Sequence, residues 1–387
     1  MLQQTRRRFF QQFGALLVAA KAPLRGFAAP LPDSMVLLGT QTGAGIYRAR
    51  WNARTGQLGT PELAIASTRP TFLALHGTLP IVYAGNEGDG PAATVSAFAV
   101  ERTTATLSAL GTQPTHGSSP CFVSVDRSGQ LLFAANYGGG SLATFPLDAQ
   151  GVPGSAELFS CSQSGLCGTP GPVHDRQDGP HLHCAVLSPD NQFVLACDLG
   201  DDAILAFPLH PGQQPGLGMP QRLPARVGSG PRHLAFHPNG QWLYCIHELD
   251  CTVDRYIWRS SKGVAEAQLV PHDVVRLAGP STTSTPNTAA EIAISRNGQF
   301  LYTCTRGIDI LTVFRIDPAT GSLRQVQQLP CGGQSPRFFA LDPTEQWLLC
   351  TNQVSESITV FARNTATGQL APHATIPMPS PMCVVWL

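Results

Sequence analysis

The chain has 387 residues, of which 43% are hydrophobic and only 13% charged, and its formal net charge at pH 7 is zero. This balance gives no basic face for nucleic acid, and no apolar run is long enough to span a bilayer. The 38 glycines and 33 prolines favour an all-β protein with many tight turns.

The N-terminus has the pattern of a twin-arginine export signal. The sequence TRRRFF at residues 5–10 is followed by a modest apolar stretch at 13–20 and by a small-residue cleavage site at 28–29. We therefore expect residues 1–29 to be a signal segment, residues 30–387 to be the mature protein, and the protein to be periplasmic. The alternative is a disordered basic N-terminus on a cytoplasmic protein.

A strand–turn–strand pattern then recurs six times along the chain. Each copy has alternating apolar residues, a central polar turn and a second β-rich run, which predicts a β-hairpin. The copies begin at Thr71, Cys121, His183, Arg232, Ala290 and Arg337, and they end at Glu87, Tyr137, Leu199, Glu248, Arg306 and Gln353. Further strands are predicted at 141–148, 203–210, 310–317 and 357–364. A period of roughly 50 residues with four strands per unit is typical of β-propeller blades.

The two ends of the chain supply one more blade. Residues 380–387 match only the first strand of a hairpin, whereas residues 35–58 look like the later strands of a blade that lacks its first. Pairing the C-terminal strand with the N-terminal strands would close the ring and remove open sheet edges. The sequence thus predicts an all-β, seven-bladed β-propeller of four-stranded blades in a single domain, residues 30–387.

The hairpin ends place chemically active residues at one mouth of the central channel. The two strands of a hairpin are antiparallel, so its first and last residues lie at the same end. This mouth is predicted to hold His183, Arg232, Glu248, Arg306, Arg337 and Gln353.

An insertion at residues 151–178 leads directly into His181 and is a candidate for the channel rim. It contains Cys161 and Cys167, which could form a disulfide in an oxidising compartment, and no cysteine or histidine spacing resembles a zinc site. The run 174–176 (His-Asp-Arg) is interpreted as a solvated part of this loop.

These motifs resemble those of a known family. GPHLH at 179–183 and GPRH at 230–233, followed by HEL at 247–249, are similar to the seven-bladed propeller lactonases. That family includes the propeller-type 6-phosphogluconolactonases and the carboxy-cis,cis-muconate cyclases, and the resemblance covers nearly all of the chain after the signal. It implies the catalytic residues His183, Arg232, Glu248 and Arg306. His247 and Thr305 stand where the family has asparagine.

The residue types suit lactone opening without a metal or another cofactor. A base must activate water, and cationic donors must stabilise the developing oxyanion. His183 and Glu248 are both candidates for the base, with His183 favoured. We assign substrate binding to His181, His233, Arg337 and Gln353, against a purely structural alternative for Arg337 and His181.

The leading hypothesis is a monomeric lactone hydrolase of 6-phosphogluconolactonase type that acts on a small-molecule lactone or sugar acid. Export would separate it from phosphorylated sugars, so an unphosphorylated aldonolactone is considered as substrate. The alternatives are a muconate-type cycloisomerase, in which the arginines clamp carboxylates, and a non-catalytic propeller that binds a partner.

Overall fold

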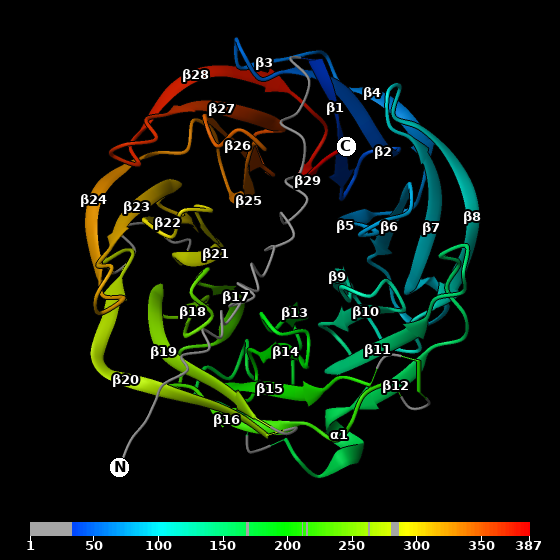
Figure 1. The fold of residues 1–387 in the computed structure, drawn as a ribbon, viewed down its shortest axis with the longest axis vertical. Helices are drawn as coiled ribbons and strands as arrows, with labels where there is room; N and C mark the ends of the chain where they lie inside the picture. The colour runs from blue at the N-terminus through cyan, green and yellow to red at the C-terminus, as the bar shows by residue number, and fades with distance from the viewer. Residues whose placement is uncertain (1–32, 168–169, 211, 214–215, 262–263, 280–285) are drawn as a thin grey trace, which may run out of the picture.

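Seven β-sheets are arranged around a central channel in the computed structural model of the protein (Figure 1). The structure describes residues 33–167, 170–210, 212–213, 216–261, 264–279 and 286–387. The predicted signal segment, residues 1–29, lies outside the described residues. The seven-bladed propeller predicted from the sequence is confirmed.

Six blades each contain four consecutive antiparallel strands, ordered from the channel outward. Blades 1 and 2 comprise β5 (Pro70–Leu75), β6 (Ile81–Asn86), β7 (Thr94–Glu101), β8 (Thr106–Pro114), β9 (Pro120–Val125), β10 (Leu131–Asn136), β11 (Ser141–Pro146) and β12 (Glu157–Ser160). Blades 3 and 4 comprise β13 (Val186–Leu187), β14 (Phe193–Asp198), β15 (Ala203–Pro208), β16 (Gln221–Pro224), β17 (Pro231–Phe236), β18 (Trp242–His247), β19 (Thr252–Ser261) and β20 (Val264–Arg276). Blades 5 and 6 comprise β21 (Thr288–Ile294), β22 (Phe300–Arg306), β23 (Ile310–Ile316), β24 (Leu323–Pro330), β25 (Pro336–Leu341), β26 (Trp347–Asn352), β27 (Ser357–Arg363) and β28 (Leu370–Pro377).

Blade 7 closes the ring with strands from both ends of the chain. Its strands are β29 (Pro381–Trp386), β1 (Asp33–Thr40), β2 (Gly45–Asn52), β3 (Gln57–Leu58) and β4 (Glu62–Ala66). β29 pairs antiparallel with β1, and Figure 1 shows the C-terminus beside it. The outer edge of this blade departs from the simple four-strand prediction because β3 and β4 pair separately with β2.

The hydrophobic core lies between neighbouring blades. One cluster joins Leu195 of blade 3 to Leu243 and Tyr256 of blade 4, all fully buried. Turns hold the hairpins in register, and Asp317 shows how. Its Oδ1 accepts the backbone N–H groups of Ala319 and Thr320, and Gly321 ends the turn at a φ of +79°, which favours glycine.

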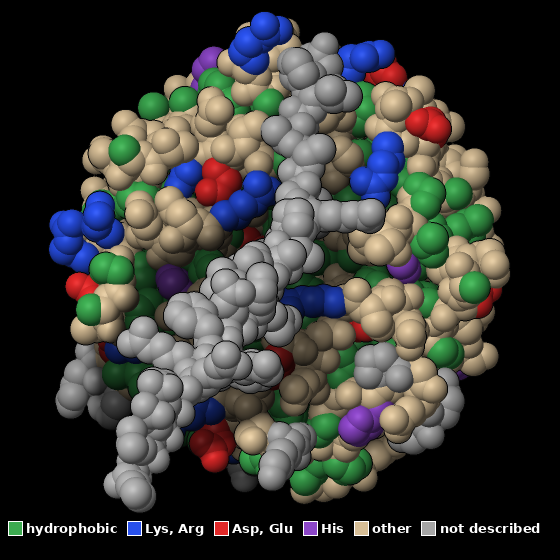
Figure 2. Space-filling view, in the orientation of Figure 1, with side chains coloured by type: hydrophobic (Ala, Val, Ile, Leu, Met, Phe, Trp, Pro, Cys, Tyr) green, Lys and Arg blue, Asp and Glu red, His purple; other side chains and the backbone are tan. Residues whose placement is uncertain are grey.

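The insertion at 151–178 is partly a blade element. It includes β12, the outer strand of blade 2, and the short helix α1 (Cys161–Ser164) follows directly. Farther along the insertion, Gly171 and Gln177 hydrogen-bond to the backbone of Gly200 and Leu199, just after β14. In the described residues, no helix has the length and hydropathy needed to cross a bilayer. On the face shown in Figure 2, the arginine side chains that can be seen lie in separate small groups.

Candidate active site

A β-bulge recurs at the mouth end of the innermost strands. In β17 the pairing register shifts between Pro231 and His233, which leaves Arg232 between them without a partner in the ladder. A bulge of this kind turns a side chain away from the regular pleat. The residues at the equivalent position in β5, β9, β25 and β29 are Thr71, Cys121, Arg337 and Met382. All five bulged residues, together with His183, line one narrow pocket in the channel.

Glu248 lies at the centre of an arginine cluster. Its Oε2 accepts hydrogen bonds from Arg232 Nε at 2.9 Å and lies 3.1 Å from Arg306 Nη2. Its Oε1 accepts a hydrogen bond from Arg176 Nη2 at 2.6 Å. The carboxylate is therefore held by side chains from β17, β22 and the insertion.

The cluster is buried and strongly biased toward the ionised carboxylate. The side chains of Glu248 and Arg232 are 5% and 2% exposed. Burial alone would raise the pKa of Glu248, but the neighbouring guanidinium groups, that of Arg306 foremost, outweigh it and hold the pKa far below its usual value. Glu248 is accordingly an anion at neutral pH and a weak base.

His183 is a buried neutral base beside this cluster. Its ring lies edge-on to Tyr137 and His233, with centroid distances of 5.6 and 5.1 Å. Nδ1 lies 3.8 Å from Cys121 Sγ. Burial, and then the charge of Arg232, hold the pKa of His183 well below its ordinary value. Nε2 has no hydrogen-bond partner in the described part of the chain.

Arg337 is a cation without a counterion of its own. It lines the pocket and makes no hydrogen bond or ion pair with any residue that the structure describes. Burial and the like charges of Arg232 and Arg306 lower the pKa of Arg337 to about 10. The structural alternative required Arg337 to pair with a neighbouring carboxylate, and the described residues show no such pair.

Glu291 is a site residue that sequence reasoning missed. Its Oε1 lies 3.0 Å from His233 Nδ1, and both side chains line the pocket. Phe72, His233 and Phe338, the second residues of three other hairpins, also line the pocket, and the ring of Phe72 stacks on that of Phe122 with centroids 4.2 Å apart. The sequence did contain a signal for this residue, because Glu291 occupies the position at which other hairpin copies have phenylalanine.

Arg176 is a second residue that was missed, because the segment 174–176 was interpreted as solvated. The ion pair of Arg176 with Glu248 corrects that interpretation. No spacing rule predicts the contact, since the insertion is not part of the repeat.

Two of the predicted substrate-binding residues lie beside the pocket and do not line it. His181 stacks on Tyr137 at 4.5 Å, and its Nε2 lies 2.8 Å from Asp178 Oδ1. Gln353, which follows β26 of blade 6, donates to the side chain of Gln41, which follows β1 of blade 7. Their polar groups hold loops of the mouth.

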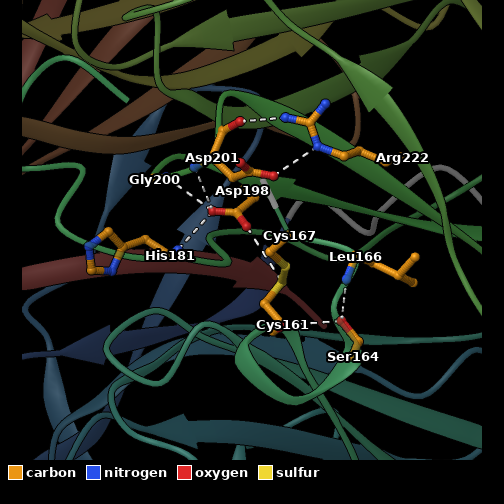
Figure 3. The surroundings of a disulfide bond; sticks show 9 residues. All are labelled: Cys161, Ser164, Leu166, Cys167, His181, Asp198, Gly200, Asp201 and Arg222. Carbon is orange, nitrogen blue, oxygen red and sulfur yellow. Dashed lines mark hydrogen bonds and ion pairs between the residues drawn. A yellow bond between two sulfur atoms is a disulfide. The ribbon is translucent and has the colours of Figure 1, made fainter. Parts of the chain in front are cut away.

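The disulfide allowed by the sequence is formed between Cys161 and Cys167 (Figure 3). Asp198 lies beside it, and Asp198 Oδ1 accepts the backbone N–H groups of His181, Gly200 and Asp201. In the described residues, the one group close enough to hold a metal comprises Cys161, Cys167 and Asp198. The disulfide occupies both sulfurs.

The four residues assigned to catalysis come together at one mouth. Arg232 connects them, because it lines the pocket with His183 and also binds Glu248, which in turn binds Arg306.

Comparison with known proteins identifies the family. The family model described as "Lactonase, 7-bladed beta-propeller" matches residues 35–386. This chain belongs to that family. The 6-phosphogluconolactonase of Bacillus subtilis (strain 168) is 32% identical over 345 residues, which cover 89% of this chain and 94% of the relative. The 6-phosphogluconolactonase of Formosa agariphila is 30% identical, covering 85% and 91% of the two chains.

A solved structure is also similar. The periplasmic gluconolactonase of Pseudomonas aeruginosa superposes with a TM-score of 0.82 at 27% identity, covering 92% of this chain and 99% of that one. The family and these relatives make the protein an enzyme of the lactonase class of hydrolases, similar to the 6-phosphogluconolactonases.

Proposed function

We propose that this lactonase hydrolyses an aldonolactone without a phosphate group, such as gluconolactone, in the periplasm. The observation that carries the proposal is a neutral buried histidine beside an unpaired guanidinium at the mouth of one channel. The N-terminal twin-arginine pattern and the similarity to a protein described as a periplasmic gluconolactonase support the substrate and the location.

The residues suggest a general-base mechanism. Water attacks the lactone carbonyl while His183 Nε2 accepts its proton. Arg337, which has no counterion to displace, donates to the developing oxyanion. The ring C–O bond then breaks, and the proton on His183 passes to the departing alkoxide, which yields the hydroxy acid.

Glu248 has an electrostatic role in this mechanism. Three guanidinium groups bind the carboxylate and keep its pKa low, so it is a poor acceptor of the water proton. Its charge compensates Arg232 and Arg306 and fixes where their remaining donors point. We therefore assign the base to His183 and the positioning of the arginines to Glu248.

The test is hydrolysis of glucono-δ-lactone followed in a pH-stat, with the parent protein, His183→Ala and Arg337→Ala. We expect turnover above the spontaneous rate in the parent and a large loss in each variant. A carboxymuconate, followed by its ultraviolet absorbance, tests the cycloisomerase alternative in parallel. Turnover of the muconate without turnover of any lactone would overturn the proposal.

A partner-binding propeller without activity fits the geometry less well. That alternative expects charged groups spread over a top face, whereas three arginines here lie within 3.1 Å of one buried carboxylate.

A further inference from the structure

The two oxygens of Glu248 are held in different ways. Oε2 is bound by Arg232 and Arg306, whose side chains are 2% and 15% exposed. Oε1 is bound, among the described residues, by Arg176 alone, and that side chain is 36% exposed. Arg176 therefore covers Glu248 from the solvent side of the mouth.

The backbone of the insertion is fixed, so the position of Arg176 is not accidental. The neighbouring Gln177 is fully buried, and its Nε2 donates to the carbonyl of Leu199 at 2.9 Å. Gly171 N–H donates to the carbonyl of Gly200 at 3.0 Å. A Cβ on Gly200 would lie 1.7 Å from the carbonyl oxygen of Gly179, so only glycine permits the close approach of Gly200 to Gly179.

The guanidinium of Arg176 keeps free donors at the opening. Its Nη2 serves both Glu248 and, at 3.2 Å, Tyr137 Oη. Nε and Nη1 have no partner in the part of the chain that the structure describes. A planar guanidinium binds two oxygens at once when its neighbouring N–H groups are free.

Glu248 does not need Arg176 to stabilise its negative charge. Arg232 and Arg306 already bring two buried cations to one carboxylate. A partly exposed third pair contributes little to stability, since solvent screens it. A fixed loop that presents a spare, partly exposed guanidinium over the site is better explained by a ligand than by folding.

We propose that Arg176 is a further substrate-binding residue of this lactonase, which exchanges its bond to Glu248 Oε1 for oxygens of the bound sugar lactone. The inference rests on the proposed function and adds to it the contact on the solvent side of the substrate. After this exchange, Oε1 of Glu248 can accept a hydrogen bond from a substrate hydroxyl, while Oε2 stays bound to Arg232 and Arg306.

The experiment measures KM and kcat for glucono-δ-lactone with the parent, Arg176→Ala and Arg176→Lys, together with their melting temperatures. Arg222→Ala is the matched control, because Arg222 is 34% exposed and pairs at 2.9 Å with buried Asp201 (Figure 3) and not with Glu248. We expect Arg176→Ala to raise KM about tenfold or more, the scale of a lost charged hydrogen bond, with kcat changed much less. Arg176→Lys should give an intermediate KM, because lysine keeps the charge and loses the planar fork.

An active parent whose KM is unchanged in Arg176→Ala would overturn the role of Arg176 and leave the proposed function standing, whatever the melting temperature does. An equal rise of KM in Arg222→Ala would also overturn it. A parent without activity on any aldonolactone would overturn the proposed function, and this assignment with it.

Discussion

The residues at the bulge position differ between two sides of the same mouth, although the backbone there is alike. In blades 4 and 6 this position presents Arg232 and Arg337, whereas in blades 1, 2 and 7 it presents Thr71, Cys121 and Met382. The register shift is the same on both sides, so the difference lies in side chains alone. The propeller thus supplies a ring of equivalent positions, and the site arises where a few of them are charged.

The largest expected effect is on the charged side, at Glu248. Glu248→Ala leaves Arg232 buried without its counterion, and breaking a buried pair of this kind costs about 3–5 kcal/mol. We expect a lower free energy of unfolding in urea and a loss of lactonase activity. The control is Glu62→Ala, which removes a 71% exposed carboxylate from an outer-rim pair with Arg48. Equal effects of the two substitutions would contradict the arginine cluster described above.

The next largest effect is expected for His183→Ala, which should lower the catalytic rate and leave the fold intact. His183→Ala should lower kcat by about 10²–10⁴-fold, the range typical of a general base. Since the pKa of His183 is lowered, the protonated, inactive form appears only at acid pH, and kcat/KM of the parent should stay level to well below pH 6.5. His237→Ala, in the turn at the far end of β17, is the control and should leave kcat unchanged. An acid limb near pH 7 would be inconsistent with His183 as the base.

Replacing Arg337 should lower activity without lowering stability. Arg337→Ala breaks no ion pair among the described residues and removes a cation that Arg232 and Arg306 repel. We expect a loss of about 10²–10³-fold in kcat, as for removal of an oxyanion donor, with an unchanged or higher melting temperature. A lower melting temperature with full activity would show that Arg337 is structural.

These residues also show how far sequence reasoning reached. The period of the hairpins predicts the blades, and antiparallel pairing predicts that His183 and Glu248 share a mouth. Position 233 faces the channel because of the bulge, which periodicity does not reveal, so its partner Glu291 was missed. Arg176 was beyond reach for another reason. An insertion has no repeat to align with, and its path depends on tertiary contacts such as that of Gln177 with Leu199.

A smaller effect is expected at Asp198, which supports the insertion. Burial raises the pKa of Asp198 to about 6, and Cys161 Sγ, 3.5 Å from Oδ2, cannot donate a hydrogen bond while it is part of the disulfide. The folded protein therefore holds this proton more tightly than the unfolded chain, and Asp198 makes stability fall as pH rises from about 4 to 6.

Asp198→Asn removes that dependence and keeps an oxygen for the three backbone donors. Relative to the parent, its free energy of unfolding should rise between pH 4 and 6, by up to the order of 3 kcal/mol. Asp126→Asn should change in the opposite direction and mainly below pH 4, because the pKa of Asp126 is lowered by hydrogen bonds to its carboxylate that outweigh burial. Parallel pH curves for Asp198→Asn and the parent would refute the assignment of a buried, ionising Asp198.

The smallest effect is expected on the uncharged side of the mouth, at Thr71. Its Oγ1 is buried without a hydrogen-bond partner among the described residues. Thr71→Val should therefore raise the free energy of unfolding by about 1 kcal/mol. Thr303→Val removes a similarly unpartnered hydroxyl within β22 and is the matched control for stability. If chemistry is confined to the charged side, both variants keep the kcat/KM of the parent. A selective loss of activity in Thr71→Val would extend the site across the channel, because Thr71 lines the same pocket as His183 and Arg337.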